Sequence, residues 1–329
     1  MPGTSLSLLC PAYELPFTLF IDGIHPILRS CYPTPLLRCR KHFAMNQNNS
    51  KQTILITGCS SGIGLCVAEG LQARGYRVFA TARKAEDVAM LQEKGLEALR
   101  LDLADSSSID EALGEVLTRT GGTLDALFNN GAYGQPGAVE DLRREVLREQ
   151  FETNLFGTHE LTCKVLAVMR RQGHGRIIHN SSVLGLVALP FRGAYNSSKF
   201  ALEGLTDTLR LELHDTNIHI SLIEPGPVTS RFRANAFAKY RENIDKANSP
   251  FRQTYEAMER RLTKQGPAAP FTLPPEAVLE KVLHALQAKR PKVRYYVTFP
   301  TYLFATLKRL LPHRGLDWVL RRVSRGENR

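Results

Sequence analysis

Tyr195 and Lys199 are the residues of this sequence whose types and spacing most directly predict chemistry. Four positions apart on a helix, the phenol and the ammonium lie on the same face. A phenol has a pKa of about 10 and is a weak acid or base near neutral pH, but a neighbouring cation favours the phenolate. Ser182, which follows an apolar run ending at His179, offers a hydroxyl for a substrate oxygen. The trio predicts proton transfer to or from a carbonyl or alcohol oxygen.

A glycine-rich turn lies where a nucleotide site requires one. A β-branched run at 53–57 predicts a buried strand, and a helical pattern begins near residue 63. Between them stand Gly58, Gly62 and Gly64, in the spacing G-x-x-x-G-x-G. A strand, a glycine turn and a helix N-terminus present free N–H groups and the helix dipole to a phosphate. Tyr and Lys at this spacing also occur on ordinary exposed helices, so the turn supplies the context that favours catalysis.

Five motifs follow one another in the order of the short-chain dehydrogenase/reductase family, which the chain resembles over about residues 51–228. They are Thr57-Gly58 with Gly62-Ile63-Gly64, Asn129-Asn130-Gly131-Ala132, Asn154, Ser182 with Tyr195 and Lys199, and Pro225-Gly226. The segments 190–191 and 198–204 are most similar to the subgroup of 17-beta-hydroxysteroid and retinol dehydrogenases. The family usually has Asn-Asn-Ala-Gly where this chain has Gly131-Ala132 after the asparagines. We therefore expect close approach of the cofactor with an altered local backbone.

The resemblance implies hydride exchange between a nicotinamide cofactor and a carbinol carbon. It gives Tyr195 the role of proton donor and acceptor, while Lys199 lowers the pKa of Tyr195 and binds the nicotinamide ribose. Ser182 would fix the substrate oxygen, and Asn154 would hold a water that continues the proton path. The implied cofactor-binding residues are Gly58, Ser60, Ser61, Gly62, Ile63, Gly64, Arg83, Asp102, Leu103, Asn130, Gly131, Tyr195, Lys199, Pro225, Gly226, Val228 and Thr229.

Arg83 predicts which nicotinamide cofactor is used. It follows the predicted strand 77–81, where an NAD-specific enzyme would present an acid to the ribose hydroxyls. An acid there would repel a 2′-phosphate, whereas an arginine can pair with it through two parallel hydrogen bonds. We therefore predict NADP(H) in preference to NAD(H). Asp102, at the end of the next strand, matches the residue that accepts the adenine amine in the family.

Apolar runs and helical periods alternate along the chain. The alternation predicts an α/β fold in one domain, a doubly wound parallel sheet of the Rossmann type covered on both faces. The predicted strands are 53–57, 77–81, 98–101, 124–129, 175–181, 218–223 and 293–298. The predicted helices are near 63–73, 85–94, 107–119, 140–171, 192–214 and 275–288. Ligand is expected beyond the carboxyl ends of the strands, where the motifs lie.

Composition predicts a soluble, cytoplasmic enzyme. The chain has 329 residues, of which 43% are hydrophobic and 23% charged, so it can bury a substantial core without the help of disulfides or structural metals. Its six cysteines show neither CxxC nor Cys/His ligand spacing, which predicts reduced thiols and no metal site.

The first 44 residues stand apart from the predicted domain, which we place at 45–298. Their apolar stretch 6–21 is broken by Pro11, Glu14 and Pro16, which disfavours a membrane span or a signal peptide. We expect 1–44 to be a disordered extension before Met45, with a targeting segment as the alternative.

The tail 299–329 is basic and amphipathic. Residues 289–329 hold eleven Lys or Arg and two acids, Asp317 and Glu327, among many large apolar side chains. They predict a helix packed on the body with a solvated basic face, or alternatively a peripheral anchor to an anionic membrane. No nucleic acid partner is expected, because no recognition module accompanies the charge. A homo-oligomer remains a possible assembly.

An insertion at about 227–274 bears on the substrate. It carries Phe232, Phe237, Tyr240, Phe251, Tyr255 and Met258. We expect a helical lid over an apolar pocket, which favours a lipophilic steroid-like or retinoid-like alcohol or ketone. Alternatively, these side chains merely pack the insertion onto the core. The competing functions are a 3-oxoacyl thioester reductase and a non-catalytic nucleotide-sensing module, which typically lacks the Tyr and Lys. Extended sugar-nucleotide epimerases would show a different glycine spacing.

Overall fold

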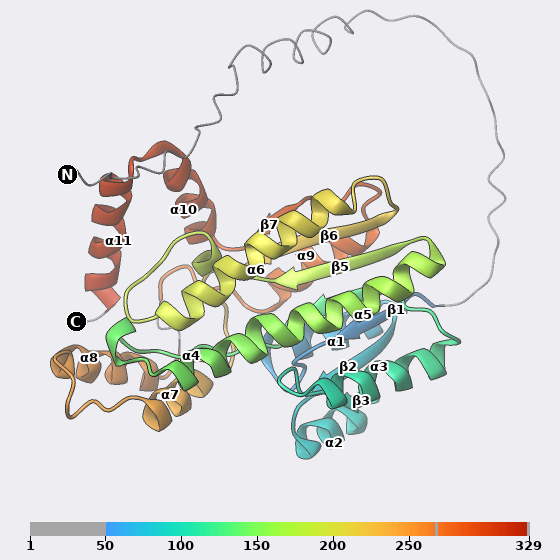
Figure 1. The fold of residues 1–329 in the computed structure, drawn as a ribbon, viewed down its shortest axis with the longest axis horizontal. Coiled ribbons are helices and arrows are strands. Elements are labelled where there is room, and N and C mark those ends of the chain that lie inside the picture. The colour runs from blue at the N-terminus through green and yellow to red at the C-terminus, as the bar shows by residue number, and fades with distance from the viewer. Residues whose placement is uncertain (1–50, 267–268, 328–329) are drawn as a thin grey trace, which may run out of the picture. The chain divides into compact units, whose positions relative to one another are not determined.

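A seven-stranded parallel sheet forms the centre of the protein (Figure 1). The computed structural model describes residues 51–266 and 269–327. The strands are β1 (Thr53–Ile56), β2 (Arg77–Ala82), β3 (Glu97–Arg100), β4 (Ala126–Asn129), β5 (Gly175–Asn180), β6 (Ile218–Glu224) and β7 (Arg294–Tyr296). Their order is β3-β2-β1-β4-β5-β6-β7, and all six pairings are parallel. The predicted doubly wound α/β fold is confirmed.

Helices cover both faces of the sheet because successive strand residues point to opposite sides. Ile54 and Ile56 of β1 pack with α1, α2 and α9, whereas Leu55 packs with α3, α5 and α6 on the other face. These helices are α1 (Gly62–Gln72), α2 (Ala85–Glu93), α3 (Ser106–Thr120), α5 (Gly157–Gln172), α6 (Gly193–Glu212) and α9 (Glu276–Gln287). The two apolar layers fix the strand ends that carry the motifs.

The predicted helix 140–171 is divided in the structure. A 3₁₀ turn (Val139–Asp141) and α4 (Arg144–Phe151) precede a π-helical segment (Glu152–Phe156), after which α5 continues. A π turn accommodates one more residue than an α turn and is frequent at functional sites. The apolar period does not reveal it, because the segment stays helical on both sides.

Four helices lie outside this frame. α7 (Phe232–Asn243) and α8 (Arg252–Thr263) stand between β6 and α9, and α10 (Phe299–Leu310) and α11 (His313–Glu327) follow β7. Figure 1 shows all four beyond the end of the sheet toward which the arrow of β5 points. None of the described helices is both long and apolar enough to cross a membrane. The predicted extension 1–44 and the start at Met45 lie outside the described residues.

Candidate active site

The turn between β1 and α1 leaves no room for side chains at its key positions. Gly58 has a positive φ of 71°, and a Cβ there would lie 2.7 Å from the Cα of Gly131. A Cβ at Gly64 would lie 2.2 Å from the carbonyl oxygen of Gly58. α1 starts after Ser61 without a side-chain cap and carries no acid in its first turn. Its free N–H groups and dipole therefore fit an anionic phosphate. The predicted Ser60, Ser61, Gly62 and Ile63 all lie half-buried in this turn.

Asn130 ties three strand ends together. Its Nδ2 donates to the carbonyl oxygens of Thr57 and Gly58, each at 3.0 Å, and its Oδ1 accepts from Asn180 Nδ2 at 2.9 Å. Gly131 donates its N–H to Thr57 Oγ1 at 2.8 Å. The side chain of Asn130, predicted to contact the cofactor, thus uses its amide to shape the glycine turn. A Cβ at Gly131 would lie 3.1 Å from Leu103 Cδ1 and 3.2 Å from Thr57 Oγ1, so a glycine fits this position closely.

Ser182, Tyr195 and Lys199 come together at the carboxyl ends of β5 and β6. Ser182 begins a 3₁₀ turn, where its Oγ accepts from Leu184 N at 3.1 Å, and it hydrogen-bonds the phenol of Tyr195. Lys199 Nζ lies 5.7 Å from the centroid of the Tyr195 ring and donates to the carbonyl oxygen of Asn180 at 2.8 Å. The structure therefore brings together the three residues in which the sequence predicts acid–base chemistry.

Burial governs the ionisation of this trio. It raises the pKa of Tyr195 to about 12, and the hydrogen bond from Ser182 offsets only part of that rise. It lowers the pKa of Lys199 to about 8, against the attraction of Glu203. The prediction that Lys199 lowers the pKa of Tyr195 is therefore not met, because burial raises that pKa and Ser182, not Lys199, is the neighbour that opposes the rise. Tyr195 is a neutral hydroxyl, and thus a proton donor, throughout the neutral range.

Asn154 is buried in the π-helical segment, with its side chain directed at protein groups. Its Oδ1 accepts from Tyr133 N at 3.1 Å. Its Nδ2 donates to Tyr133 O at 2.9 Å and to Ser198 Oγ at 3.2 Å. The side chain of Asn154 therefore links Tyr133 to Ser198, next to Lys199, and the water that Asn154 would hold stays a prediction. The π-helical turn at Glu152–Phe156 directs the side-chain amide of Asn154 at the backbone of Tyr133.

Arg83 and Asp102 stand where the adenosine end of a dinucleotide is expected. Arg83 follows β2 and is exposed, and the described residues offer its guanidinium no hydrogen bond or ion pair. Asp102 is half-buried and its Oδ1 accepts from Ala104 N at 3.0 Å, which fixes the turn after β3. The backbone of Leu103, the next residue, lies in close contact with Gly157. A Cβ at Gly157 would lie 1.7 Å from the Leu103 carbonyl oxygen. Gly157 is a residue that sequence reasoning missed.

The loop after β6 is fixed beside Ser182. Pro225 O accepts from Val183 N at 2.8 Å, and a Cβ at Gly226 would lie 2.2 Å from Thr298 Oγ1. Val228 bridges to Leu273, whose carbonyl oxygen accepts from Thr229 N at 3.0 Å. Of the predicted loop residues, Pro225 therefore lies next to the hydroxyl of Ser182.

Phe232 is the predicted insertion residue that reaches Tyr195. The two rings meet edge to face with centroids 5.3 Å apart, and Phe232 also covers Gly134. The other predicted side chains of the insertion pack with one another, with Ala138 and with Phe191. Among the predicted insertion residues, Phe232 is therefore the one that the described contacts join to Tyr195, and the lid over an apolar pocket stays a prediction. Their cluster contains Phe237, Tyr240, Phe251, Tyr255 and Met258.

The C-terminal helices form a second wall beside Tyr195. Phe304 of α10 and Leu320 of α11 are buried in a cluster with Leu184 and Leu189, which also contacts Tyr195. The packed-helix interpretation of the tail is thus met by two helices instead of one.

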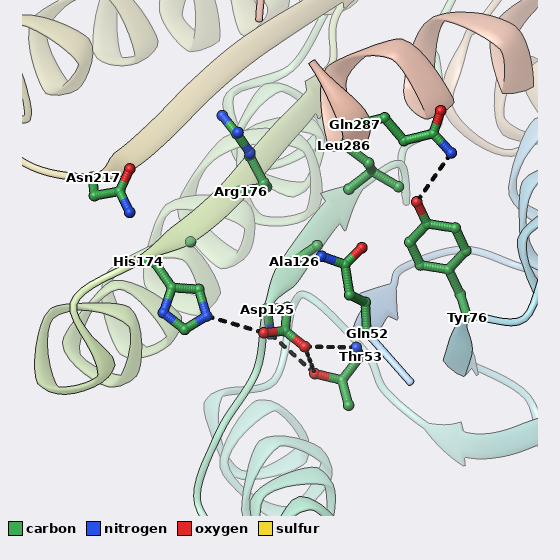
Figure 2. A pocket seen from close by; sticks show the side chains of 11 residues that line it. Gln52, Thr53, Tyr76, Asp125, Ala126, His174, Arg176, Asn217, Leu286 and Gln287 are labelled. Carbon is green, nitrogen blue, oxygen red and sulfur yellow. Dashed lines mark hydrogen bonds and ion pairs between the residues drawn. The ribbon is translucent and has the colours of Figure 1, made fainter. Parts of the chain in front are cut away.

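A cavity of about 500 Å³ lies at the amino-terminal ends of the strands, away from all of these residues. Figure 2 shows its lining, in which His174 pairs with Asp125 at 3.1 Å and Asp125 accepts from Thr53. None of the predicted site residues lines it.

Sequence reasoning also missed a buried charge cluster behind Lys199. Glu203, Glu224 and Arg294 meet there from α6, β6 and β7. Only the position of Glu203, one turn after Lys199, could have been read from the spacing. Cys59 of the glycine turn is buried, which raises the pKa of its thiol to about 12.

Comparisons with known proteins agree with this site. Residues 52–241 match the family described as short chain dehydrogenase. The chain is 42% identical over 270 residues to the uncharacterized oxidoreductase YbbO of Escherichia coli K12, covering 82% of this chain and 94% of that protein. It is 34% identical to the NADPH-dependent 3-dehydrocapnine reductase of Ornithobacterium rhinotracheale, covering 80% of this chain and 94% of that protein.

Similarity extends to an animal enzyme and to solved structures. Human 17-beta-hydroxysteroid dehydrogenase type 1 is 35% identical over 262 residues, covering 76% of this chain and 78% of that protein. The crystal structure of a short-chain dehydrogenase from Streptomyces avermitilis superposes with a TM-score of 0.65 at 29% identity, covering 84% of this chain and 98% of that one.

Proposed function

The chain belongs to the short-chain dehydrogenase/reductase family and is an oxidoreductase, and we propose that it interconverts a lipophilic alcohol and its ketone or aldehyde with NADP(H). The alcohol is secondary or primary. The observation that carries the proposal is the hydrogen bond between Ser182 and Tyr195, with Lys199 buried beside them. A neutral phenol and a serine hydroxyl directed to one point are suited to a substrate oxygen that gains a proton.

Each residue has a separate role in the reduction. The nicotinamide cofactor, held by the glycine turn, supplies the hydride. Ser182 donates a hydrogen bond to the substrate carbonyl, and Tyr195 transfers its proton as the oxygen becomes negative. Lys199 stabilises the phenolate that remains, because its ammonium faces the ring in a low-dielectric site. Asn154 keeps Ser198, and with it the first turns of α6, in place.

Arg83 supports NADP(H). Its exposed guanidinium is free of acidic partners in the described part of the chain, at the position where a 2′-phosphate is expected. An Arg–phosphate pair is planar and bidentate, so it adds both affinity and selectivity. The NADPH dependence of the Ornithobacterium relative agrees with this preference.

The lipophilic substrate class is supported by the walls of the site. Phe232 on one side and the cluster of Leu184, Leu189, Phe304 and Leu320 on the other present apolar surface to Tyr195. Apolar walls with a few convergent polar groups are typical of sites for hydrophobic ligands. The hydroxysteroid substrate in the name of the human relative is of that class.

The experiment that tests this function is NADPH oxidation with probe carbonyls: a 17-ketosteroid, retinal, decanal and an acetoacetyl thioester. We expect turnover with one of the first three and a fall of roughly 10²-fold or more in Tyr195→Phe, which loses only the proton donor. NADPH binding by that variant should stay normal. Turnover with the thioester alone would favour a 3-oxoacyl thioester reductase instead. Normal turnover in Tyr195→Phe would exclude the proposed chemistry.

We further propose that α10 contacts an anionic membrane surface, from which such a substrate would enter. Phe299, Tyr302, Leu303 and Leu310 are exposed at helical spacing on one face of α10. The ring of Phe271 contacts that of Phe299 in a tilted arrangement with centroids 4.9 Å apart, and Phe271 is exposed as well. α10 contains no acid, and Lys308 and Arg309 lie in its last turn. Aromatic side chains with neighbouring cations suit the interface of anionic lipids.

Vesicle sedimentation tests this contact. The wild type should sediment with vesicles containing phosphatidylserine at low salt and release as salt shortens the Debye length. Phe299→Ser with Leu303→Ser should abolish sedimentation without changing the melting temperature. If the wild type ignores the vesicles and gel filtration instead gives a dimer that this variant disrupts, a second copy covers the face.

A further inference from the structure

Two glutamates meet in the protein interior behind Lys199. Glu203 of α6 and Glu224 of β6 are 7% and 0% exposed. Their side chains lie within hydrogen-bonding reach of each other. Arg294 of β7 donates from Nη2 to Glu203 Oε2 at 3.0 Å, and its Nε lies 3.0 Å from Glu224 Oε1.

One guanidinium cannot satisfy these carboxyl groups. Arg294 Nη2 also donates to Asp207 Oδ2 at 2.7 Å, so its guanidinium is divided among three acids, of which Asp207 has a second cation in Arg210 at 3.5 Å. Neither oxygen of Glu224 makes a well-directed hydrogen bond with any described residue. Glu203 Oε1 likewise lacks a well-directed hydrogen bond within the described part of the chain. Two buried carboxylates in contact repel each other strongly unless one carries a proton. The geometry therefore calls for a carboxyl–carboxylate pair that holds one proton.

The ionised member of the pair faces the catalytic lysine. Glu203 lies one helical turn after Lys199, so the two side chains share a face of α6. The side chain of Glu203 also lies beside Ser181, the residue before Ser182, whose hydroxyl lowers the pKa of Glu203 although its Oγ makes no well-directed hydrogen bond. A Cβ at Gly185 would lie 3.1 Å from Glu203 Oε1, so the serine turn closes directly over this carboxyl group.

We propose that Glu203 and Glu224 share one proton, and that Glu203 is a positioning residue that keeps Lys199 charged and the Ser181–Ser182 turn in place. Glu224, enclosed in the core, holds the proton, and Glu203 carries the negative charge. This inference rests on the proposed function only for its effect on turnover; the shared proton stands without it.

The surrounding charges agree with this assignment. Burial and the neighbouring Glu203 raise the pKa of Glu224 to about 9, while burial also raises the pKa of Glu203. The other ionisable groups beside the pair are Lys199 and Asp207 on α6 and Arg294 and Tyr296 on β7. Three further groups interact with these neighbours: His179 on β5 with Lys199, Arg210 on α6 with Asp207, and Arg309 on α10 with Tyr296. Of these, the buried His179 is neutral, because burial lowers the pKa of its imidazole to about 3.

Infrared spectroscopy tests the shared proton without any substrate. At pH 7 the wild-type protein should show the carbonyl stretch of a protonated carboxyl group. An ordinary glutamate, with a pKa of about 4.3, would be ionised at this pH and would not show that band. This band should disappear as pH rises through about 9 and should be missing in Glu224→Gln. A spectrum of the wild type at pH 7 without the band would overturn the proposal.

The pH dependence of NADPH-linked reduction of a probe ketone tests the link to Lys199. Activity should fall as pH rises through the Lys199 pKa of about 8, because the ammonium is then lost. In Glu203→Gln the removal of the neighbouring negative charge should move this fall about one pH unit lower or more. A merely structural role would lower activity at all pH values without moving the profile.

Three further variants guard the interpretation. Glu203→Asp should restore the profile toward that of the wild type, because it keeps the charge. Glu224→Gln should shift the profile less than Glu203→Gln, because it imitates the protonated member. Glu212→Gln, exposed at the end of the same helix, should leave the profile unchanged.

A Glu203→Gln profile that superposes on the wild type, in a protein with a native circular dichroism spectrum, would refute the positioning role. If no probe is reduced, the proposed substrate class fails while the infrared result still decides the shared proton.

Discussion

The glycine turn after β1 and the α7–α8 segment, whose Phe232 contacts Tyr195, are built in opposite ways. The turn is held by backbone atoms: a Cβ at Gly58 would lie 2.7 Å from the Cα of Gly131, and a Cβ at Gly64 would lie 2.2 Å from the carbonyl oxygen of Gly58. The α7–α8 segment is held by side chains, with Tyr240, Tyr255 and Met258 buried in a cluster of its own. Backbone contacts cannot be repacked, whereas side-chain clusters can. The turn should therefore tolerate no substitution, and the segment many.

Gly64→Ala should show the largest effect. Its Cβ would lie 2.2 Å from the Gly58 carbonyl oxygen, so the turn must open or the helix must shift. We expect a loss of about 3 kcal/mol or more in the free energy of unfolding, together with loss of NADPH binding. Gly114→Ala in α3 is the matched control, because a Cβ there meets nothing within 4 Å. That variant should gain up to about 1 kcal/mol from helix propensity. Equal denaturation midpoints for the two would contradict the contrast.

Leu320→Ala should rank second. Leu320 is buried in the cluster that packs α11 against Leu184 and Leu189. Removal of its side chain should cost about 2–3 kcal/mol and loosen the wall beside Tyr195, which should raise KM. Leu310→Ala, where the leucine is 73% exposed, should change the free energy of unfolding by less than about 0.5 kcal/mol. Thermal melting curves of both variants would show whether the tail is packed as described.

Lys199→Met should stabilise the protein while it abolishes turnover. Burial lowers the pKa of Lys199 from 10.5 to about 8, so the folded state resists the charge that the unfolded chain accepts. Below about pH 8 the free energy of unfolding of the wild type is therefore reduced by the burial of the charged ammonium. This loss disappears as pH rises from about 8 to 10.5, because the folded protein is then neutral at Lys199 while the unfolded chain is still charged. We expect the variant to be about 1–2 kcal/mol more stable at pH 7, after the lost hydrogen bond to Asn180 is subtracted.

Denaturant unfolding at several pH values measures this difference. The advantage of Lys199→Met should shrink above pH 8 and be smallest near pH 10.5. An advantage that grows with pH would show that Lys199 does not carry the buried charge.

Phe232→Ala should show the smallest effect. The ring meets Tyr195 edge to face, an arrangement that contributes about 0.5–1.5 kcal/mol. We expect a rise in KM of up to about tenfold for a lipophilic probe, with little change in the melting temperature. Phe237→Ala, inside the cluster of the α7–α8 segment, should instead lower the melting temperature and leave the edge-to-face contact intact. Identical kinetics of wild type and Phe232→Ala would remove Phe232 from the substrate site.

The sequence sufficed for the frame of the fold because local periods determine it. Alternating apolar runs located all seven strands within a few residues, and the glycine spacing placed the turn before α1. The trio of Ser182, Tyr195 and Lys199 followed from one helical spacing and one strand end. The π turn at Glu152–Phe156 was missed because it does not interrupt the helical period.

Long-range pairing explains the remaining misses. Glu224 and Arg294 are joined by the register of β6 and β7, which no local pattern specifies. The pKa of Tyr195 was predicted with the wrong sign because a spacing shows which charges are near but not how much water is excluded. Likewise, only the folded chain shows that Asn130 and Asn154 direct their amides at protein backbone.

The separate core of the α7–α8 segment has a consequence for how such enzymes diverge. Because its buried residues are contacted mainly from within the segment and from Ala138 and Phe191, the segment can be rewritten between its two ends while the sheet stays intact. Descendants of one ancestor could thus acquire new substrates by recombination at these ends and inherit the hydride chemistry without change. A chimera that takes residues 232–263 from a relative should fold, keep its coenzyme and adopt the preference of the donor.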